Sequence, residues 1–356
     1  MEFRTIDSIE TPALIIDMDA LEYNIKKMSD YLSDKSAKLR PHFKTHKSPI
    51  IAKMQLDAGA KGLTCAKLGE AEVLATSGIE DILIANQIVT NEKICRLAGL
   101  ARNARITVCV DNVANIQDLS EAALKYGSII HVLIEIDVGM QRCGVDTKED
   151  VLSLAKQIEA SKGLVFEGFQ AYAGQLSHNP DNSARVKGVE EAIEKISDIK
   201  AYLEKNSISV KEISGAGTGT HNITGNNTIW TEIQAGSYVF MDTDYTQLNL
   251  GFKESLSILT TVIHKNNSVA ITDAGQKACC MTAGYPTIKG HSDLFAVLSE
   301  EHGKIIDDND ELQYLQRIEY IPSHCCTTAN LHDFYYCVRN GLWEATWPVA
   351  ARGRYR

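Results

Sequence analysis

The sequence contains no apolar run that approaches the roughly 20 residues needed to cross a bilayer. Its first ten residues, MEFRTIDSIE, lack the apolar stretch of a secretory signal. A surplus of basic residues is also absent, because the net charge is −10, whereas nucleic acids and anionic membranes select basic surfaces. These absences predict a cytoplasmic protein that has neither a nucleic acid nor a membrane as its partner.

The cysteines lack the Cys-x-x-Cys spacing of a redox or zinc motif, and their number, nine, is odd. We expect most of them to be reduced, buried, small hydrophobic residues, as in a cytosolic protein. The adjacent Cys325 and Cys326 are treated separately below. The chain does have length, and 356 residues with 44% hydrophobic content predict about two domains.

Strand-like and helix-like segments alternate regularly through residues 37–250. The expected strands are 37–44, 62–67, 81–86, 105–110, 130–136, 164–172, 211–217 and 232–238. Helical apolar spacing occurs between them, and the expected helix ends carry stop signals at Gly59, Gly78, Gly127 and Gly163. This pattern predicts an α/β fold, a (β/α)8 barrel of the TIM type, with a doubly wound open sheet as the alternative.

The pattern changes near residue 251. Four β-rich segments follow without a long amphipathic helix, at residues 255–263, 268–272, 294–298 and 314–321. They predict a second, mainly antiparallel β domain. We expect the barrel to span residues 18–250 and the β domain to span 251–356, joined by the strand-like N-terminal segment 1–17.

The stretch LRPHFKTHK, residues 39–47, places Lys44 at the end of the first expected strand, near the cationic Arg40 and Lys47. An amine that is crowded by positive charge and partly desolvated loses its proton more easily, as a Schiff-base lysine requires. An ordinary solvated basic loop is the alternative. The position favours the catalytic interpretation, because functional groups in such barrels gather at the carboxyl ends of the strands.

Two glycine-rich turns lie at the ends of the seventh and eighth expected strands, where such barrels commonly hold a phosphate. Glycine lets the backbone approach an anion, and amide and hydroxyl groups can donate to it, although each turn alone is more typical of a tight loop. The residues concerned are Gly217, Thr218 and Gly219 in the first turn and Gly236, Ser237 and Tyr238 in the second. A ligand with a phosphate at one end and an aldehyde for Lys44 at the other is pyridoxal 5′-phosphate.

These segments resemble the D-serine dehydratase and D-threonine aldolase family of alanine-racemase-like, fold-type III pyridoxal-phosphate enzymes. The resemblance spans nearly the whole chain in order, at RPHFKTHK (40–47), EIDVGMQRCG (135–144), QAYAG (170–174), GTGT (217–220) and PSHCCTT (322–328). It implies that Lys44 forms the Schiff base, that the two turns hold the phosphate, and that Arg142 and Tyr172 contact the cofactor ring. It also implies a homodimer. An ion pair with Asp137 is the alternative for Arg142.

His324 and Cys326 stand two positions apart on an expected extended segment, so both side chains can point to one face. Imidazole and thiolate together suit zinc, while burial of both in the core is the alternative. The resemblance implies a divalent metal held by this pair and completed by water or substrate. The softness of the two ligands favours zinc over manganese or magnesium. Cys325 would face the other way, and a polar hairpin contact accounts for residues 300–303, which include His302.

In the family that this chain resembles, dehydratases carry cysteine at the second metal position, whereas aldolases usually carry aspartate. Cys326 therefore predicts a dehydratase of D-3-hydroxy amino acids, similar to D-serine dehydratase, which forms a 2-oxo acid and ammonia. A D-threonine-type aldolase is the alternative, with His178 as a candidate base. A non-catalytic pyridoxal-phosphate carrier is the second alternative, disfavoured by the β domain and the His-x-Cys pair.

Overall fold

The computed structural model describes residues 4–356, without the side chain of Ser292. The chain forms two compact units. The barrel unit comprises Ser29–Lys44, Ile51–Gly236 and Arg354–Arg356, and the β unit comprises the chain up to Met28, Thr45–Ile50 and Ser237–Gly353. The chain therefore passes between units directly after Lys44 and directly after Gly236. The boundaries predicted from the sequence, 18–250 and 251–356 with 1–17, stay a prediction.

The barrel unit contains an eight-stranded parallel sheet in the order β2-β9-β8-β7-β6-β5-β4-β3. Its strands are β2 (Lys38–Leu39), β3 (Leu63–Cys65), β4 (Asp81–Gln87), β5 (Arg105–Val110), β6 (Ile130–Glu135), β7 (Leu164–Ala171), β8 (Glu212–Gly215) and β9 (Glu232–Ile233). A parallel bridge between His42 and Thr64 joins the two edge strands. Because this bridge closes the sheet, the predicted (β/α)8 barrel is confirmed and the open-sheet alternative is wrong.

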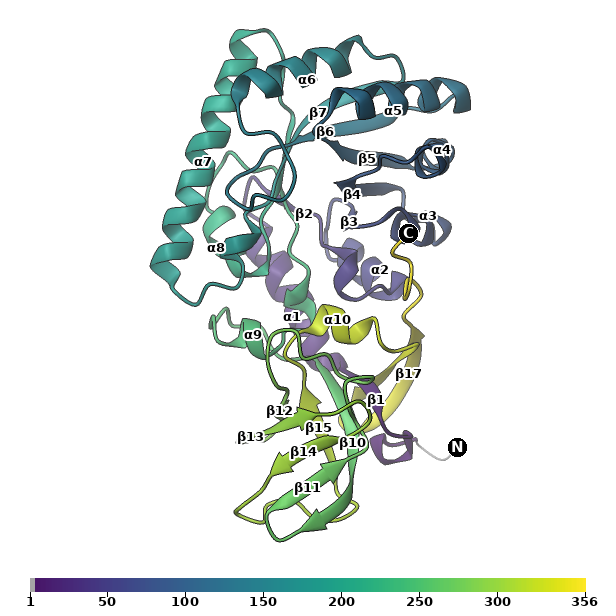
Figure 1. Ribbon diagram of the computed structural model, residues 1–356, viewed down its shortest axis with the longest axis vertical. Coiled ribbons are helices and arrows are strands. Elements are labelled where there is room, and N and C mark those ends of the chain that lie inside the picture. The colour runs from purple at the N-terminus through teal and green to yellow at the C-terminus, as the bar shows by residue number, and fades with distance from the viewer. Residues whose placement is uncertain (1–3) are drawn as a thin grey trace. The chain divides into compact units, whose positions relative to one another are not determined.

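Helices lie on the outside of these strands (Figure 1). They are α3 (Leu68–Thr76), α4 (Asn91–Leu100), α5 (Val113–Tyr126), α6 (Lys148–Ala160) and α7 (Asn182–Lys205), with α1 (Met18–Leu32) and α2 (Pro49–Asp57) crossing between the units. In α5 the Asn112 side chain accepts from the N–H of Ala114, and Gly127 ends the helix with a φ of 63°. The predicted glycine stop signals are confirmed at Gly59, Gly78, Gly127 and Gly163, which all have positive φ.

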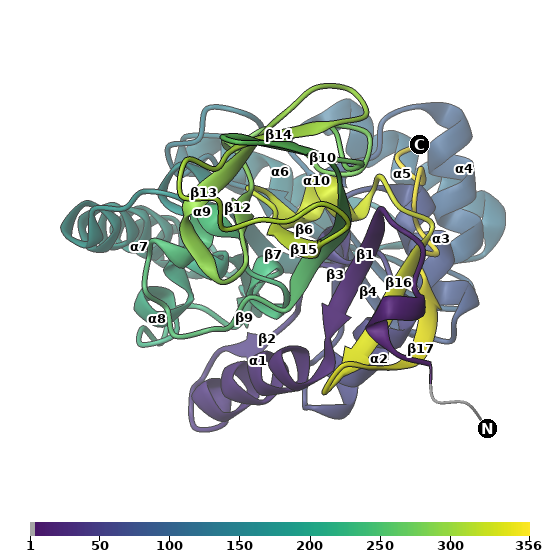
Figure 2. The ribbon, with the colours of Figure 1, turned by 90° about the horizontal axis from the view of Figure 1, so that it is seen from below.

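The β unit contains a nine-stranded sheet in the order β11-β14-β13-β12-β15-β10-β1-β16-β17, with β11 also pairing to β10. Its strands are β1 (Ala13–Asp17), β10 (Leu256–Asn266), β11 (Val269–Thr272), β12 (Thr287–Ile288), β13 (His291–Leu298), β14 (Gly303–Ile306), β15 (Arg317–Ile321), β16 (Phe334–Arg339) and β17 (Leu342–Pro348). All pairings are antiparallel except that of β1 with β16 (Figure 2). The mainly antiparallel second domain is therefore confirmed.

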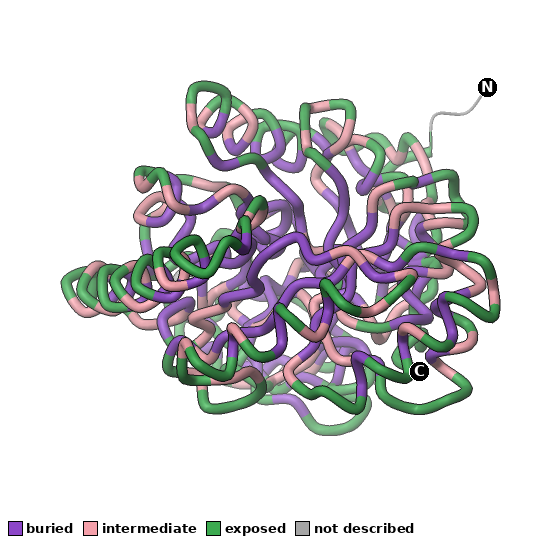
Figure 3. Tube along the Cα trace, turned by 90° about the horizontal axis from the view of Figure 1, so that it is seen from above, coloured by how far each residue is buried: buried purple, intermediate pink, exposed green. Residues whose placement is uncertain are grey.

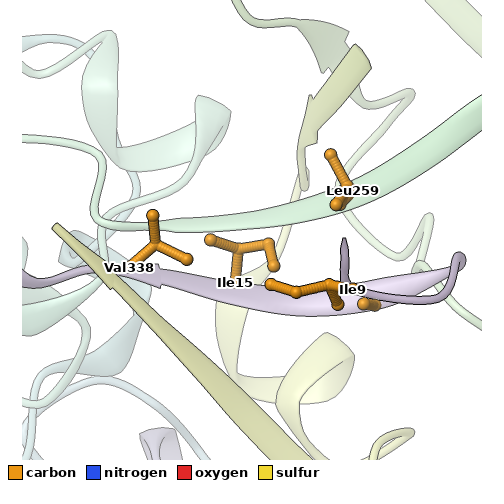
Figure 4. Packing of buried hydrophobic residues seen from close by; sticks show 5 residues of the cluster. Ile9, Ile15, Leu259 and Val338 are labelled. Carbon is orange, nitrogen blue, oxygen red and sulfur yellow. The ribbon is translucent and has the colours of Figure 1, made fainter. Parts of the chain in front are cut away.

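Burial follows the strands in both units. In the barrel unit β5 and β6 are almost wholly buried, whereas the helices alternate between buried and exposed faces (Figure 3). In the β unit the N-terminal strand packs its apolar side chains against strands that are far away in the sequence. The cluster comprises Ile9, Ala13, Ile15, Leu259 and Val338 (Figure 4). Burial of such side chains contributes about 25 cal/mol per Å² and holds β1 between β10 and β16.

The sequence missed several elements of the β unit, namely β12, β14, β16, β17 and the short helix α10 (Cys325–Ala329). The sequence predicts an extended segment through His324 and Cys326, and this prediction is wrong for Cys326. His324 is extended, with a φ of −148°, but Cys326 lies in the first turn of α10. Within residues 4–356 no helix combines the length and the apolar character needed to cross a membrane.

Candidate active site

Lys44 lies on a 3-10 turn, Phe43–Thr45, beyond the carboxyl end of β2. Phe43 and Thr45 are buried on either side of it, while the Lys44 side chain is exposed. The backbone ladder continues past the named strand, because the N–H of His42 donates to the carbonyl of Ala235. The turn thus presents a lysine amine to solvent at the carboxyl end of the barrel, directly beyond the backbone hydrogen bond of His42.

The sequence predicts that cationic side chains, Arg40 among them, crowd Lys44. For Arg40 the barrel unit shows a different role. The Arg40 guanidinium is buried and binds Asp81 at 2.8 Å and Glu232 at 2.8 Å. Burial opposes the charge of Glu232, but Arg40 and Lys61 lower the pKa of this carboxyl to about 2. The charge of Arg40 is therefore neutralised within the barrel by Asp81 and Glu232.

The first glycine-rich turn is built by close packing. It leads from β8 into a 3-10 turn, Thr218–Thr220, followed by the four-residue helix α8 (His221–Thr224). A Cβ on Gly219 would lie 1.9 Å from the carbonyl oxygen of Ser177, and a Cβ on Gly217 would lie 2.9 Å from the Ser177 hydroxyl. The backbone N–H of Gly217 donates to the hydroxyl of Thr220 at 3.2 Å. These glycines are required by contact with Ser177, a residue that no sequence pattern singles out.

Tyr172 and Arg142 lie together at the same end of the barrel. The Tyr172 hydroxyl is 3.3 Å from the Ser177 hydroxyl, and the Arg142 guanidinium carbon is 5.8 Å from the centre of the Tyr172 ring. The acidic partner of Arg142 is Glu135, at 3.9 Å. Burial raises the pKa of Glu135, while a hydrogen bond from Gln87 and the charge of Arg142 oppose this shift. The structure thus brings Tyr172, Arg142 and the turn at Gly217 to one end of the barrel.

The alternative for Arg142 is an ion pair with Asp137. In the structure the Asp137 carboxylate binds backbone groups instead. Its carboxylate accepts hydrogen bonds from the backbone N–H groups of Gly139 and Gln141 at 2.9 and 3.0 Å. Asp137 therefore shapes the loop that carries Arg142 rather than neutralising its guanidinium.

The second turn continues into the β unit, where Ser237–Val239 form a 3-10 turn. Tyr238 is fully buried, and its ring packs against Phe252 with 5.6 Å between centroids. The hydroxyl of Ser237 lies 3.5 Å from the sulfur of Cys326. Tyr238 therefore belongs to the core of the β unit, and Ser237 contacts the predicted metal ligand within that unit. Contacts of either residue with a cofactor stay a prediction.

His324 and Cys326 contact each other, although Cys326 is helical. The hydrogen bond with Cys326 raises the pKa of His324 to about 9 against the opposing effect of burial, and negative charge on Cys326, Asp242 and Cys280 adds to the increase. Asp242 is buried, and its carboxylate accepts from the backbone N–H of Cys325 at 2.9 Å. This hydrogen bond fixes the start of α10. The helix start, rather than strand alternation, brings the imidazole and the sulfur together.

The donor set fits a divalent metal. An imidazole nitrogen and a cysteine sulfur in contact are a borderline-soft pair of the kind that zinc prefers. Among residues 4–356 no cluster of three or more histidine, cysteine, aspartate and glutamate side chains is arranged to hold a metal. Completion of the coordination by water or substrate stays a prediction.

Two other predicted features are placed as follows. His178 is half-buried and follows Ser177 directly, beyond the 3-10 turn Gly174–Leu176. Residues 299–302 form the turn between β13 and β14, where the N–H of Ser299 donates to the carbonyl of His302 at 2.9 Å. Glu301 pairs with Lys277 at 2.8 Å. These contacts agree with a polar hairpin for residues 300–303.

Comparison with known proteins places this architecture in a family. The family model "Alanine racemase, N-terminal domain" matches residues 16–244, and the model "Putative serine dehydratase domain" matches residues 255–338. The chain belongs to the alanine-racemase-like, fold-type III pyridoxal-phosphate enzymes. Together the two matches cover most of the chain, in agreement with a resemblance that spans nearly its whole length.

Several of the similar proteins are aldolases. The chain is 40% identical to 3-hydroxy-D-aspartate aldolase of Paracoccus denitrificans, over 97% of this chain and 93% of that protein. It is 37% identical to D-threonine aldolase of an Arthrobacter species, with the same coverage of 97% and 93%. The crystal structure of D-threonine aldolase from Filomicrobium marinum superposes with a TM-score of 0.96 at 36% identity, covering 99% of each chain.

A dehydratase is also similar, at lower identity. D-threo-3-hydroxyaspartate dehydratase of a Delftia species is 31% identical over 96% of this chain and 98% of that protein. Structures of such a dehydratase include a His→Ala variant and, two positions further along that chain, a Cys→Ala variant in a metal-free form. All these relatives are lyases, and this chain is an enzyme of the lyase class.

Proposed function

We propose that this protein is an aldolase of D-3-hydroxy amino acids that depends on pyridoxal phosphate and a divalent metal. It cleaves the Cα–Cβ bond of its substrate and releases glycine and an aldehyde. The observation that carries this proposal is the similarity over nearly the full chain to two aldolases, at 40% and 37% identity, against 31% for the dehydratase. The aldolase alternative thus replaces the dehydratase that the sequence predicted.

Cys326 led the sequence interpretation toward the dehydratase, and this inference was too strong. The same chain that carries Cys326 is more similar to aldolases than to the dehydratase over the same length. The identity of one metal ligand sets the softness of the site but does not decide which bond of the substrate breaks. Dehydration stays the second candidate, because the two altered positions of the dehydratase have the same spacing as His324 and Cys326.

Lys44 would hold the cofactor through its amine. The turn Gly217–Gly219 and the residues Gly236 and Ser237 would hold its phosphate, and Arg142 and Tyr172 would lie against its ring. The support is that Lys44, Arg142, Tyr172 and the first turn all follow carboxyl ends of barrel strands, where such folds place their ligands. When bound, pyridoxal phosphate supplies an electron sink for the pair left on Cα after the carbon–carbon bond breaks.

His324 and Cys326 would hold the metal, with zinc as the preferred ion and manganese or magnesium as alternatives. The contact between their side chains supports this assignment. A metal held there supplies Lewis acidity toward the β-hydroxyl of the substrate.

Cleavage also needs a base for the hydroxyl proton, because the hydroxyl carbon becomes the carbonyl carbon of the aldehyde. We assign this proton to His178. It follows Ser177, whose hydroxyl and carbonyl contact Tyr172 and the turn at Gly219. A ring nitrogen of its imidazole would take the hydroxyl proton and return it to solvent after the aldehyde leaves.

The proposal is tested by product analysis. Cofactor-loaded protein is incubated with D-threonine and with D-3-hydroxyaspartate, with and without a chelator. The aldolase yields glycine with acetaldehyde from the first substrate and glycine with glyoxylate from the second, and the chelator abolishes both. Release of a 2-oxo acid and ammonia instead would establish the dehydratase. The predicted homodimer is checked on the same preparation by its sedimentation mass.

A further inference from the structure

The sulfur of Cys326 has two hydroxyl groups beside it in the β unit. The Thr45 hydroxyl oxygen lies 3.3 Å from the sulfur, and the Ser237 hydroxyl oxygen lies 3.5 Å from it. Thr45 is only 1% exposed, and it precedes Cys326 by 281 positions in the chain. The contact is therefore a long-range feature of the fold that no local sequence motif around Cys326 encodes.

A hydroxyl group suits this position because it can act either as an acceptor or as a donor of the hydrogen bond to the sulfur. With Cys326 as a thiol, the sulfur donates to the Thr45 oxygen. A cysteine that ligates a metal does so as a thiolate, which only accepts hydrogen bonds. The threonine hydroxyl can then rotate and donate to the sulfur, since a hydroxyl carries both a proton and lone pairs.

Thr45 is also well placed to orient the sulfur of Cys326. It is the last residue of the 3-10 turn Phe43–Thr45 and directly follows Lys44 in the chain. As a buried β-branched residue it has few allowed rotamers, so its hydroxyl is held in place by packing. A thiolate bound to a metal is oriented by such neighbours, which touch the ligand and not the ion.

We propose that Thr45 is a positioning residue for the metal ligand Cys326. Its hydroxyl donates to the thiolate, restricts the orientation of the sulfur and so strengthens metal binding. Ser237 adds a second, longer contact to the same sulfur. The proposal rests on the metal site of the proposed function, and it assigns to the residue after Lys44 a role in holding the metal.

The test measures metal affinity directly. Zn²⁺ is titrated into cofactor-loaded wild-type protein and its variants in competition with a chromophoric chelator, so the readout does not depend on turnover. Thr45→Val keeps the side-chain shape and removes the hydroxyl, whereas Thr45→Ser keeps the hydroxyl. Thr327→Val is the matched control, because the Thr327 hydroxyl follows Cys326 in α10 but donates to the His324 carbonyl at 3.3 Å.

We expect Thr45→Val to weaken Zn²⁺ binding by about 10-fold or more, the usual effect of removing a hydrogen bond to a metal ligand. Thr45→Ser and Thr327→Val should stay close to wild type. Unchanged affinity in Thr45→Val, or an equal loss in Thr327→Val, overturns the inference while the metal site stands. Wild-type protein that binds no Zn²⁺ overturns the metal site and this inference together.

Discussion

The two ends of the barrel use charged residues in opposite ways. At the amino ends of the strands, Asp81, Glu212 and Glu232 begin β4, β8 and β9 and pair with Arg40 and Lys61. At the carboxyl ends, Lys44 is exposed on its turn and Arg142 is half-exposed over the Tyr172 ring. The first end satisfies its charges internally, and the second leaves charged groups open to a ligand. If the proposed site is correct, stability and chemistry are separated along one sheet, as is common in such barrels.

The amino-end network is held together by burial and short ion pairs. Arg40 and Glu232 are 3% and 2% exposed and lie 2.8 Å apart, and Lys61 reaches the same carboxylate at 2.8 Å. The N–H of Arg40 also donates to the carbonyl of Ile233. The network therefore ties β2 to β9, two neighbouring strands that are only two residues long each.

The largest effect is expected from a substitution that alters only the carboxyl end of the barrel. Lys44→Ala should lower turnover by roughly 1,000-fold or more, because the group that holds the cofactor is gone. The unfolding free energy of the cofactor-free protein should change by less than about 0.5 kcal/mol, as for other exposed side chains. Steady-state kinetics and denaturant unfolding check both values. Substantial residual activity would remove Lys44 from the site.

A second substitution disrupts the ion-pair network at the amino end of the barrel. Arg40→Met should lower the unfolding free energy by about 3–5 kcal/mol, because it leaves the buried carboxylate of Glu232 without its main partner. Arg96→Met is the matched control, since Arg96 makes an exposed pair with Glu72 at 2.7 Å and should lose only about 0–1 kcal/mol. Equal losses in the two variants, measured by urea unfolding, would contradict the separation of the two ends.

Acid should weaken the amino-end network. The pKa of Glu232 is lowered from 4.5 to about 2 in the folded protein, so its contribution is fully present above about pH 4.5 and is lost as the pH falls toward 2. The difference in unfolding free energy between wild type and Glu232→Gln should therefore be a few kcal/mol at pH 7 and should shrink steadily below pH 4.5. A difference that is constant from pH 7 to pH 3 would show that Glu232 is not an ionised partner of Arg40.

A smaller effect is expected at the glycine-rich turn. Gly219→Ala would place a Cβ 1.9 Å from the Ser177 carbonyl oxygen and should displace the turn, weakening cofactor affinity by about 10- to 100-fold. Gly99→Ala is the control, because a Cβ on this helical glycine of α4 would meet only the Tyr126 ring, at 3.9 Å. Cofactor titration by absorbance distinguishes them, and equal affinities would remove the turn from the cofactor site.

The sequence was most informative about the barrel. All eight predicted strands are present, and 105–110 coincides with β5 (Arg105–Val110), because buried parallel strands are short apolar runs between helices with clear stop signals. β2 and β9 are shorter than expected, since their pairing depends on partners from the opposite end of the barrel sequence. In the β unit, β16 was missed, and it pairs with β1 near the other end of the chain.

For the proposed site, the sequence suggests only those residues whose type itself carries the chemistry. Lys44, His324 and Cys326 could be selected from the sequence because a Schiff base and a zinc ligand need those side chains. The contacts that position them could not be predicted. Asp242 fixes the start of α10 from 83 positions away, and Thr45 meets Cys326 across 281 positions. Such contacts arise from tertiary packing and leave no local pattern in the sequence.

The most direct test of the proposed aldolase runs the reaction in reverse. Cofactor- and metal-loaded protein is incubated with glycine and acetaldehyde, with Lys44→Ala in parallel, and new amino acids are separated by chirality. An aldolase forms the carbon–carbon bond and accumulates a D-3-hydroxy amino acid with wild type only. A preparation that forms no such bond, yet releases a 2-oxo acid and ammonia from D-3-hydroxyaspartate, would contradict the proposal and identify a dehydratase.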